Sequence, residues 1–316
     1  MPAEALLIDG YVDEPACLGV PPYISPYIRT VTGVLREHGF LPRYLTIDQI
    51  RTDPQLLVRR DAIGIVVMIA GITVPGKYLG GTPATLTEIQ QIGTRLRGIV
   101  RLLAGPIGFG YAPEGGKKAT RQAVSGFDHL LAGSPPEALD NFLSEGRTYG
   151  SLDYARSDPW SVGGADIIRQ HPSYPFVMCE LETARGCPRS LAGGCSFCTE
   201  PFYGAPRYRS VSSISGEVTA LARAGARHFR LGRQPDLLVY QSPGGAYPVP
   251  QPERIGELFA EIRAAAPGLK TLHIDNINPG TIARHEDAVR SALREIVCYH
   301  TPGDVAAFGM ETADPA

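Results

Sequence analysis

The sequence has no hydrophobic run long enough to cross a bilayer, since the longest apolar stretch covers only residues 62–72. It has no basic flank at its start, where MPAEALLIDGYVDE is acidic, so that segment is not typical of a signal peptide. It also has no excess of one charge, with 30 Lys and Arg against 32 Asp and Glu. A duplex nucleic acid or an anionic membrane is therefore not expected as a bulk electrostatic partner. We expect a cytoplasmic protein.

Cysteines are few and unevenly placed. Without an export signal, the six cysteines should be thiols or metal ligands in a reducing compartment. Two of them, Cys17 and Cys298, stand alone, whereas the other four lie within residues 179–198: Cys179, Cys187, Cys195 and Cys198. Clustering of this kind indicates a metal site.

The first part of the chain alternates between strand-like and helix-like segments. At 316 residues the chain is too long for one ordinary core, so two domains are expected. Strands are predicted over 5–8, 41–47, 62–72, 99–104 and 129–132, and helices over 25–38, 85–96, 117–124 and 136–143. This alternation predicts a doubly wound, flavodoxin-like parallel sheet over residues 1–146.

A second α/β alternation follows a polar, turn-rich segment, 147–172, which we interpret as a linker. Strands are predicted over 176–182, 228–231, 272–275 and 305–310, and helices over 215–224, 253–265 and 286–296. Four βα units are half of an eight-fold barrel, and a parallel sheet should not end on an unprotected strand. We therefore expect residues 173–316 to be the N-terminal part of a βα barrel, and the sequence to be a fragment of a longer protein.

The central segment ETARGCPRSLAGGCSFCTEPFYG, residues 182–204, carries the chemistry. Three thiolates in a glycine-rich loop after a strand can hold three irons of a [4Fe–4S] cluster. The fourth iron is then open to an external ligand, such as the amino and carboxylate groups of S-adenosylmethionine (SAM).

A structural zinc site is the alternative, with Cys179 or His171 as the fourth ligand. The two-residue gap between Cys195 and Cys198 suits zinc, but a second pair of that kind is missing. Cys179 also falls within a predicted buried strand, where a lone cysteine usually packs as a small hydrophobic residue.

The cysteine segment resembles the radical SAM superfamily. Cys195-Ser-Phe-Cys198 matches the second half of its motif, and Arg185-Gly-Cys187-Pro matches the usual lead-in. The departure is the first gap, which has seven residues here instead of three. The resemblance implies a [4Fe–4S] cluster on Cys187, Cys195 and Cys198, an electron donor such as ferredoxin or flavodoxin, and reductive cleavage of SAM. The substrate is unknown from the sequence.

The same resemblance implies SAM contacts at the ends of the barrel strands. Gly232 and Arg233 stand where the family has two glycines and a glutamate, so their backbone would receive the SAM amino group. Phe-Gly-Met-Glu311-Thr312 is similar to a segment whose Glu311 or Thr312 would bind the ribose hydroxyls. Asp275, at the end of the third predicted strand, is a candidate for SAM or substrate contact.

A flavodoxin-like domain before such a barrel is similar to the cobalamin-dependent branch of the superfamily. Long turn-rich loops at 9–24 and 70–82 and the glycine-rich segment 105–110 are candidate cofactor contacts. The Asp-x-His-x-x-Gly motif for cobalamin is absent, so the sequence leaves open whether cobalamin binds and methyl transfer follows. The first loop and the wide cysteine spacing also resemble an archaeal radical SAM family with a C-terminal helix-hairpin-helix tail.

The competing hypothesis is a zinc- or cluster-stabilised binding module without catalytic activity, or an inactive fragment.

Overall fold

The computed structural model describes residues 2–57, 62–74, 76–112, 119–195 and 198–306. The strands of the first half are β1 (Glu4–Glu14), β2 (Cys17–Leu18), β3 (Tyr23–Ile24), β4 (Leu41–Thr46), β5 (Ile63–Ile72), β6 (Val100–Ala104), β7 (His129–Leu130), β8 (Ala132–Gly133) and β9 (Tyr149–Gly150). Its helices are α1 (Pro26–Glu37), α2 (Ile47–Thr52), α3 (Leu86–Arg95), α4 (Pro135–Glu145) and α5 (Tyr154–Gly163).

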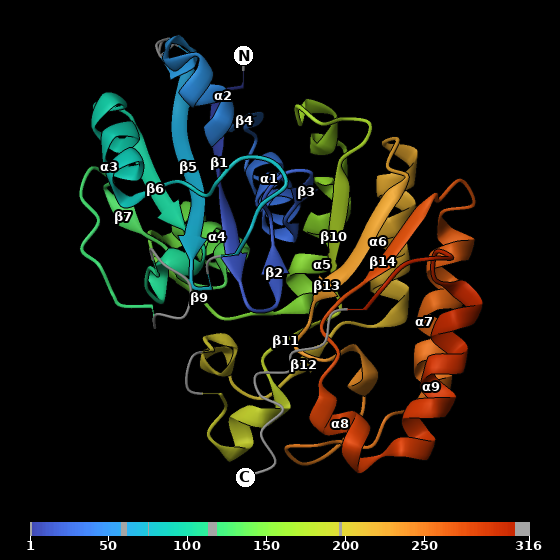
Figure 1. The fold of residues 1–316 in the computed structure, drawn as a ribbon. Coiled ribbons are helices and arrows are strands. Elements are labelled where there is room, and N and C mark those ends of the chain that lie inside the picture. The colour runs from blue at the N-terminus through green and yellow to red at the C-terminus, as the bar shows by residue number, and fades with distance from the viewer. Residues whose placement is uncertain (1, 58–61, 75, 113–118, 196–197, 307–316) are drawn as a thin grey trace.

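The first sheet has the parallel strand order β4-β1-β5-β6-β7, with β2 folded back antiparallel on the end of β1 (Figure 1). In chain order this is the 2-1-3-4-5 arrangement of flavodoxin-like sheets, so the predicted topology is confirmed. Apolar residues of α1 and α4 pack on one face, and those of α2 and α3 pack on the other. The sheet is doubly wound.

The second half supplies β10 (Met178–Glu182), β11 (Ala184–Arg185), β12 (Arg207–Tyr208), β13 (His228–Arg233) and β14 (Thr271–Ile274), with helices α6 (Val211–Arg223), α7 (Pro252–Ala265), α8 (Pro279–Arg284) and α9 (Glu286–Tyr299). Its sheet is parallel, in the order β14-β13-β10-β3. Buried residues of α6, α7 and α9 belong to the same core as these strands. Consecutive βα units are thus present, as predicted.

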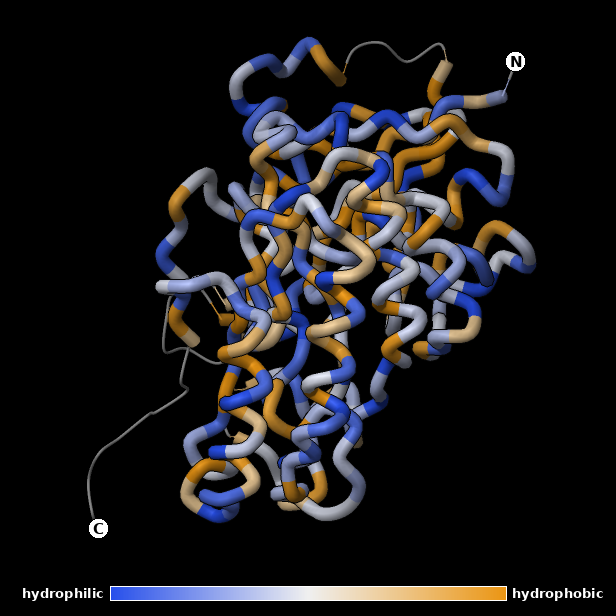
Figure 2. Tube along the Cα trace, turned by 90° about the vertical axis from the view of Figure 1, so that its right-hand side faces the viewer, coloured by the Kyte–Doolittle hydropathy of each residue, from blue (hydrophilic) through white to orange (hydrophobic). Residues whose placement is uncertain are grey.

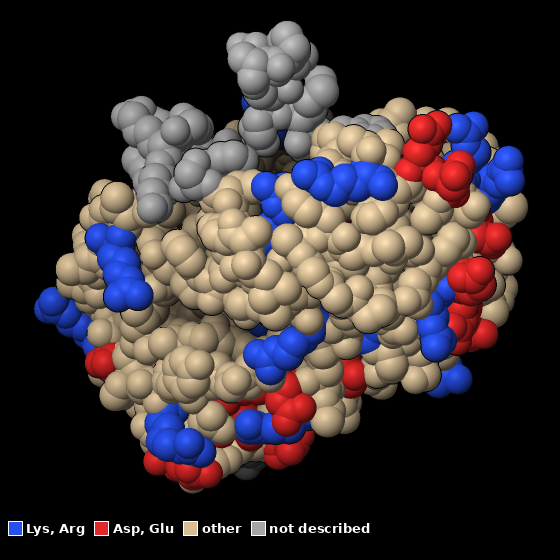
Figure 3. All heavy atoms as spheres, turned by 90° about the horizontal axis from the view of Figure 1, so that it is seen from below, with Lys and Arg blue, Asp and Glu red and all other residues tan. Residues whose placement is uncertain are grey.

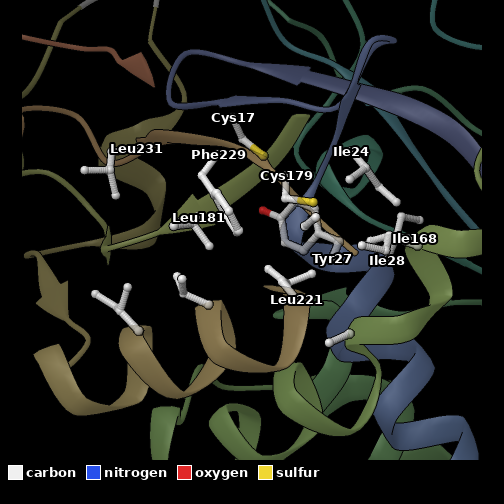
Figure 4. Packing of buried hydrophobic residues seen from close by; sticks show 14 of the residues in the cluster. Cys17, Ile24, Tyr27, Ile28, Ile168, Cys179, Leu181, Leu221, Phe229 and Leu231 are labelled. Atoms are coloured by element: carbon white, nitrogen blue, oxygen red, sulfur yellow. The ribbon is translucent and has the colours of Figure 1, made fainter. Parts of the chain in front are cut away.

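The two halves share one apolar core. Strand β3 comes from the first half yet pairs with β10, through Tyr23 with Met178 and Ile24 with Cys179. Figure 4 shows Cys17 and Ile24 of the first half packed beside Cys179 and Phe229 of the second. The cores of the two predicted domains are therefore continuous.

Much of the segment predicted as a linker, 147–172, is helical. Residues 154–163 form α5, and residues 165–170 form a short 3-10 helix. Helix α5 packs on α1 so closely that a Cβ on Gly33 would lie 2.2 Å from the carbonyl oxygen of Trp160. The polar residues that suggested a linker cover the outer side, while Trp160 and Ile167 are buried.

Two further predictions differ from the structure. The expected helix over 117–124 is absent from residues 119–124, which have no helical turn, and residues 113–118 lie outside the described ranges. The expected strand over 305–310 is not formed at residues 305–306, and its remainder lies outside the described ranges. The placement of Glu311 and Thr312 also falls outside them.

The outer helices alternate hydrophobic and hydrophilic residues, as the tube of Figure 2 shows for α7 and α9. On the face seen in Figure 3, Lys and Arg side chains lie singly or beside acidic ones, and uncharged residues cover most of the surface. No helix among the described residues is both long and apolar enough to span a membrane.

Candidate functional site

The cysteine loop, residues 187–204, is closed by a short ladder. Strand β10 leads into β11, which pairs antiparallel with β12 on the far side of the loop. The N–H of Cys187 donates to the carbonyl of Gly204 at 3.0 Å, which joins the two ends of the loop. Gly186 has a φ of +90°, and a Cβ there would lie 2.6 Å from the carbonyl oxygen of Ala205. The lead-in to Cys187 therefore requires glycine.

The three predicted cluster ligands lie together in this loop. Cys187 is buried, Cys195 and Cys198 are half-buried, and the N–H of Cys198 donates to the carbonyl of Cys195 at 3.1 Å. Burial raises the pKa of Cys187 to about 11 and that of Cys198 to about 12, and nearby Glu200 and Cys195 add to both shifts. Without a metal these two thiols are protonated at neutral pH, so metal binding would release protons.

A mononuclear metal centre is not formed within the described residues, where no group of three or more His, Cys, Asp or Glu side chains could hold one metal ion. A cubane cluster has a different requirement, because each of its irons takes its own thiolate. Three thiols on one glycine-rich loop fit that requirement.

The fourth ligands considered for zinc lie elsewhere. Cys179 is fully buried in β10 and packs in the core, where burial raises the pKa of its thiol to about 12. His171 lines a separate cavity of about 480 Å³ with Tyr11 and Asp48, and none of the loop cysteines lines that cavity. Neither residue supports a zinc site on the loop.

A buried ionic cluster lies beneath the loop, where strand ends from both halves meet. Its charged members are all at most 5% exposed: Glu14, Glu182, Arg185, Glu200 and Arg233. Tyr27 and Tyr203 donate hydrogen bonds to Glu14 at 2.7 and 2.8 Å, and Arg185 lies 2.6 Å from Glu182. Burial alone would raise the pKa of Glu182, but Arg185 and Arg233 lower it below its ordinary value.

The residues predicted to contact SAM lie at the end of β13 and just after β14, and they bind other groups of the protein. The carbonyl of Gly232 accepts from the side chain of Asn276 at 2.8 Å, and the carbonyl of Arg233 accepts from the N–H of Thr183 at 3.2 Å. The Asp275 carboxylate pairs with the guanidinium of Arg230. The structure places these residues at neighbouring strand ends, and the assignment of SAM to them stays a prediction.

A cavity of about 340 Å³ lies between the first sheet and the cysteine loop. Gly105, Gly108 and Phe109, from the glycine-rich segment after β6, form part of its wall. Arg185, Tyr203 and Arg207 line it from the side of the cysteine loop. The residues that line the cavity are Gly105, Gly108, Phe109, Arg121, Ala132, Gly133, Ser134, Tyr149, Gly150, Ser151, Leu152, Arg185, Phe202, Tyr203 and Arg207. Its volume is that of a small-molecule site, and its charged side chains are all cationic.

Several residues of this region were not predicted from the sequence. Glu182 and Glu200 flank the cysteine motif in the sequence. An acidic residue on each side of a predicted metal-binding loop could have indicated that they lie near the site. Glu14 and Tyr27 had no such signal, because their contact with the loop is with Tyr203, which is 189 and 176 residues away in the sequence.

Comparisons with known proteins agree with this architecture. No family model matches the sequence. An uncharacterized protein of Archaeoglobus fulgidus is 41% identical over 313 residues, which cover 98% of this chain and 55% of that protein. One of Methanocaldococcus jannaschii is 41% identical over 329 residues, which cover 99% and 60%. The chain thus spans little more than half the length of these curated relatives.

Two solved structures have a similar fold. The radical S-adenosylmethionine methyltransferase TsrM of Kitasatospora setae, solved with tryptophan substrate and a SAM analogue, matches with a TM-score of 0.53 and 17% identity, over 97% of this chain and 67% of TsrM. The cobalamin-dependent SAM radical enzyme OxsB matches with a TM-score of 0.60 and 14% identity, over 98% of this chain and 44% of OxsB. This chain is an α/β protein with parallel sheets and a fold similar to that of cobalamin-dependent radical SAM enzymes.

Proposed function

We propose that this chain is the cluster- and SAM-binding part of a radical SAM enzyme. One observation carries the proposal: Cys187, Cys195 and Cys198 share a single loop that leaves the carboxyl end of the first strand, β10, of a parallel βα sheet. In βα barrels the active site is built from such loops. The likeness in fold to TsrM and OxsB supports the same conclusion.

The three thiols would hold a [4Fe–4S] cluster, which when bound supplies the electron that cleaves SAM reductively. The chain's own residues bury the loop and fix its ends. Gly232, Arg233 and Asp275 are the described candidates for SAM contact, with Glu311 and Thr312 as further candidates from the sequence. The proposal includes an electron donor of the ferredoxin or flavodoxin type and a substrate that is not identified. It also includes a division of the chain into two domains near residue 146.

Cobalamin is proposed as a second cofactor, one part of which would occupy the cavity of about 340 Å³ between the first sheet and the loop. The cavity faces the carboxyl ends of the flavodoxin-like strands, where such sheets bind ligands. Gly108 offers open space there, since a Cβ on it would meet no heavy atom within 4 Å. Methyl transfer is the reaction class that this second cofactor would add.

Anaerobic reconstitution with iron and sulfide tests the proposal. We expect a brown protein that binds about four irons and that forms 5′-deoxyadenosine from SAM in the presence of dithionite. Cys187→Ala, Cys195→Ala and Cys198→Ala should each lose the cluster, whereas Cys298→Ala, at an exposed cysteine outside the loop, should keep it. One tightly bound zinc with no deoxyadenosine would instead identify a non-catalytic binding module.

A further inference from the structure

The cysteine loop must hold its thiols at a fixed spacing although seven residues separate Cys187 from Cys195. Glu200 contacts the chain on both sides of this segment, at Gly186 and at Cys198. Its N–H lies 3.4 Å from Sγ of Cys198, and its Oε1 accepts from the N–H of Gly186, the residue before Cys187, at 3.0 Å. A single residue therefore links the two outer cysteines of the loop.

Glu200 is itself held by Arg233 at the carboxyl end of β13. Nη1 of Arg233 lies 3.0 Å from Oε1 and 2.9 Å from Oε2 of Glu200, and the two side chains are at most 1% exposed. One guanidinium nitrogen thus contacts both oxygens of the carboxylate, and a charge-assisted contact of this kind between buried groups holds the carboxylate in place. Arg233 thereby ties the cysteine loop to the sheet.

The surroundings favour Glu200 as the partner of Arg233. Glu14 and Glu182 lie farther from the guanidinium, at 3.4 and 3.6 Å. The ring of Tyr203, also in the loop, lies against the guanidinium with its centroid 5.0 Å away. Arg233 thus makes two separate contacts with the loop and has little freedom to move.

We propose that the Glu200–Arg233 pair is a positioning device, which sets the separation of Cys187 and Cys198 across the widened loop. The radical SAM resemblance implies a contact between SAM and the backbone of Arg233. The side chain of Arg233 has a separate function, because it contacts Glu200 of the loop. The inference rests on the proposed cluster-binding function, because it concerns how this chain presents its thiols to a cluster.

The variants Glu200→Gln and Arg233→Lys test this inference. Glutamine keeps the size of the side chain but turns an amide N–H₂ toward Arg233. Lysine replaces the planar guanidinium by a compact ammonium, which cannot reach Glu200 and also lie against Tyr203 as the guanidinium does. Glu200→Gln should not leave an unbalanced charge, because the buried ionic cluster has three carboxylates for two guanidiniums. We expect reconstituted variants to release iron to a chelator about 10- to 100-fold faster than the unmodified chain, with an altered EPR spectrum of the reduced iron–sulfur cluster.

Glu180→Gln is the matched control. Glu180 is equally buried and pairs with Arg230 at 2.7 Å, and it makes no hydrogen bond or ion pair with the described part of the loop. This variant should keep the iron release rate and the EPR spectrum of the unmodified chain, with thermal melts of the apoproteins recorded alongside. Equal iron release by all variants, or equal loss in Glu180→Gln, would overturn the inference. Failure of the unmodified chain to take up a cluster would instead refute the proposed function.

Discussion

Arg29 of α1 and Glu217 of α6 form an ion pair of 2.7 Å in which both side chains are fully buried. The other carboxylate oxygen of Glu217 lies 2.6 Å from Arg209. The pair connects a helix of the first half to one of the second. Replacement of Glu217 by Gln should destabilise the chain by about 3–5 kcal/mol, because it leaves the buried Arg29 guanidinium without its carboxylate and leaves Arg209 with Asp158 alone. Urea unfolding at neutral pH measures the change.

An exposed pair of the same kind provides the comparison. Arg254 and Glu257 lie 3.0 Å apart, with side chains 54% and 48% exposed. Glu257→Gln should change the free energy of unfolding by less than about 1 kcal/mol, because water screens the pair. If Glu217→Gln were no more costly than this control, the buried pair would not join the two halves energetically.

The contact of α1 with α5 predicts a steric effect. A methyl group on Gly33 would lie 2.2 Å from the backbone of Trp160, so Gly33→Ala should lower the free energy of unfolding by about 1–3 kcal/mol. At Gly216 in α6 a methyl group would meet no heavy atom within 4 Å, and Gly216→Ala should stabilise the chain by about 0.5–1 kcal/mol. Thermal melts of the two variants should therefore shift in opposite directions. A shift of the same sign in both would mean that α5 is not packed on α1 as described.

The fold was largely predictable because its signals are local. The continuous apolar run of β5 and the helical spacing of α1 and α3 follow from burial on one face or on both. Helix α5 was missed because its apolar residues are few and Pro159 lies within it. Its burial depends on Gly33 of α1, which is distant in sequence.

The candidate site was predictable only in part. Spacing identified Cys187, Cys195 and Cys198 as a set, since metal ligands recur at short intervals. The ionic cluster below them was not predictable, because Glu14 and Arg233 come together through strand pairing between the halves. Long-range contacts of this kind leave no periodic pattern in the sequence.

Asp9 predicts a pH dependence of stability. It lies in β1 between β4 and β5 and is 1% exposed. Burial raises its pKa to about 7, although the Tyr44 hydroxyl and the N–H of Tyr11 donate hydrogen bonds to it. The folded chain therefore holds a proton that the unfolded chain releases near pH 4. The stability that this group contributes is complete below about pH 4 and is lost as the pH rises through 7.

Asp9→Asn removes this titration. The difference in unfolding free energy between the unmodified chain and the variant should fall by at most about 1.4 kcal/mol per pH unit from pH 5 to 7. Asp128→Asn is the control, because Arg101 holds the pKa of that carboxyl below its ordinary value and its titration lies outside this window. A flat difference for Asp9→Asn, matching the control, would contradict the prediction.

Gly108 allows a direct test of the cavity between the first sheet and the cysteine loop. A side chain at this position would extend into open space, so Gly108→Leu should fill part of the cavity of about 340 Å³ with little strain on the fold. If cobalamin binds there, a steric cost of about 1.4 kcal/mol would weaken its binding about tenfold. Equilibrium titration with hydroxocobalamin measures the difference.

Gly163→Leu is the control, since Gly163 is the last residue of α5, a Cβ on it would also meet no heavy atom within 4 Å, and it does not line the cavity. Equal affinities of both variants and the unmodified chain for hydroxocobalamin would place the cofactor elsewhere. If the unmodified chain does not bind hydroxocobalamin, cobalamin is removed from the proposal, and the test of cluster binding is unaffected.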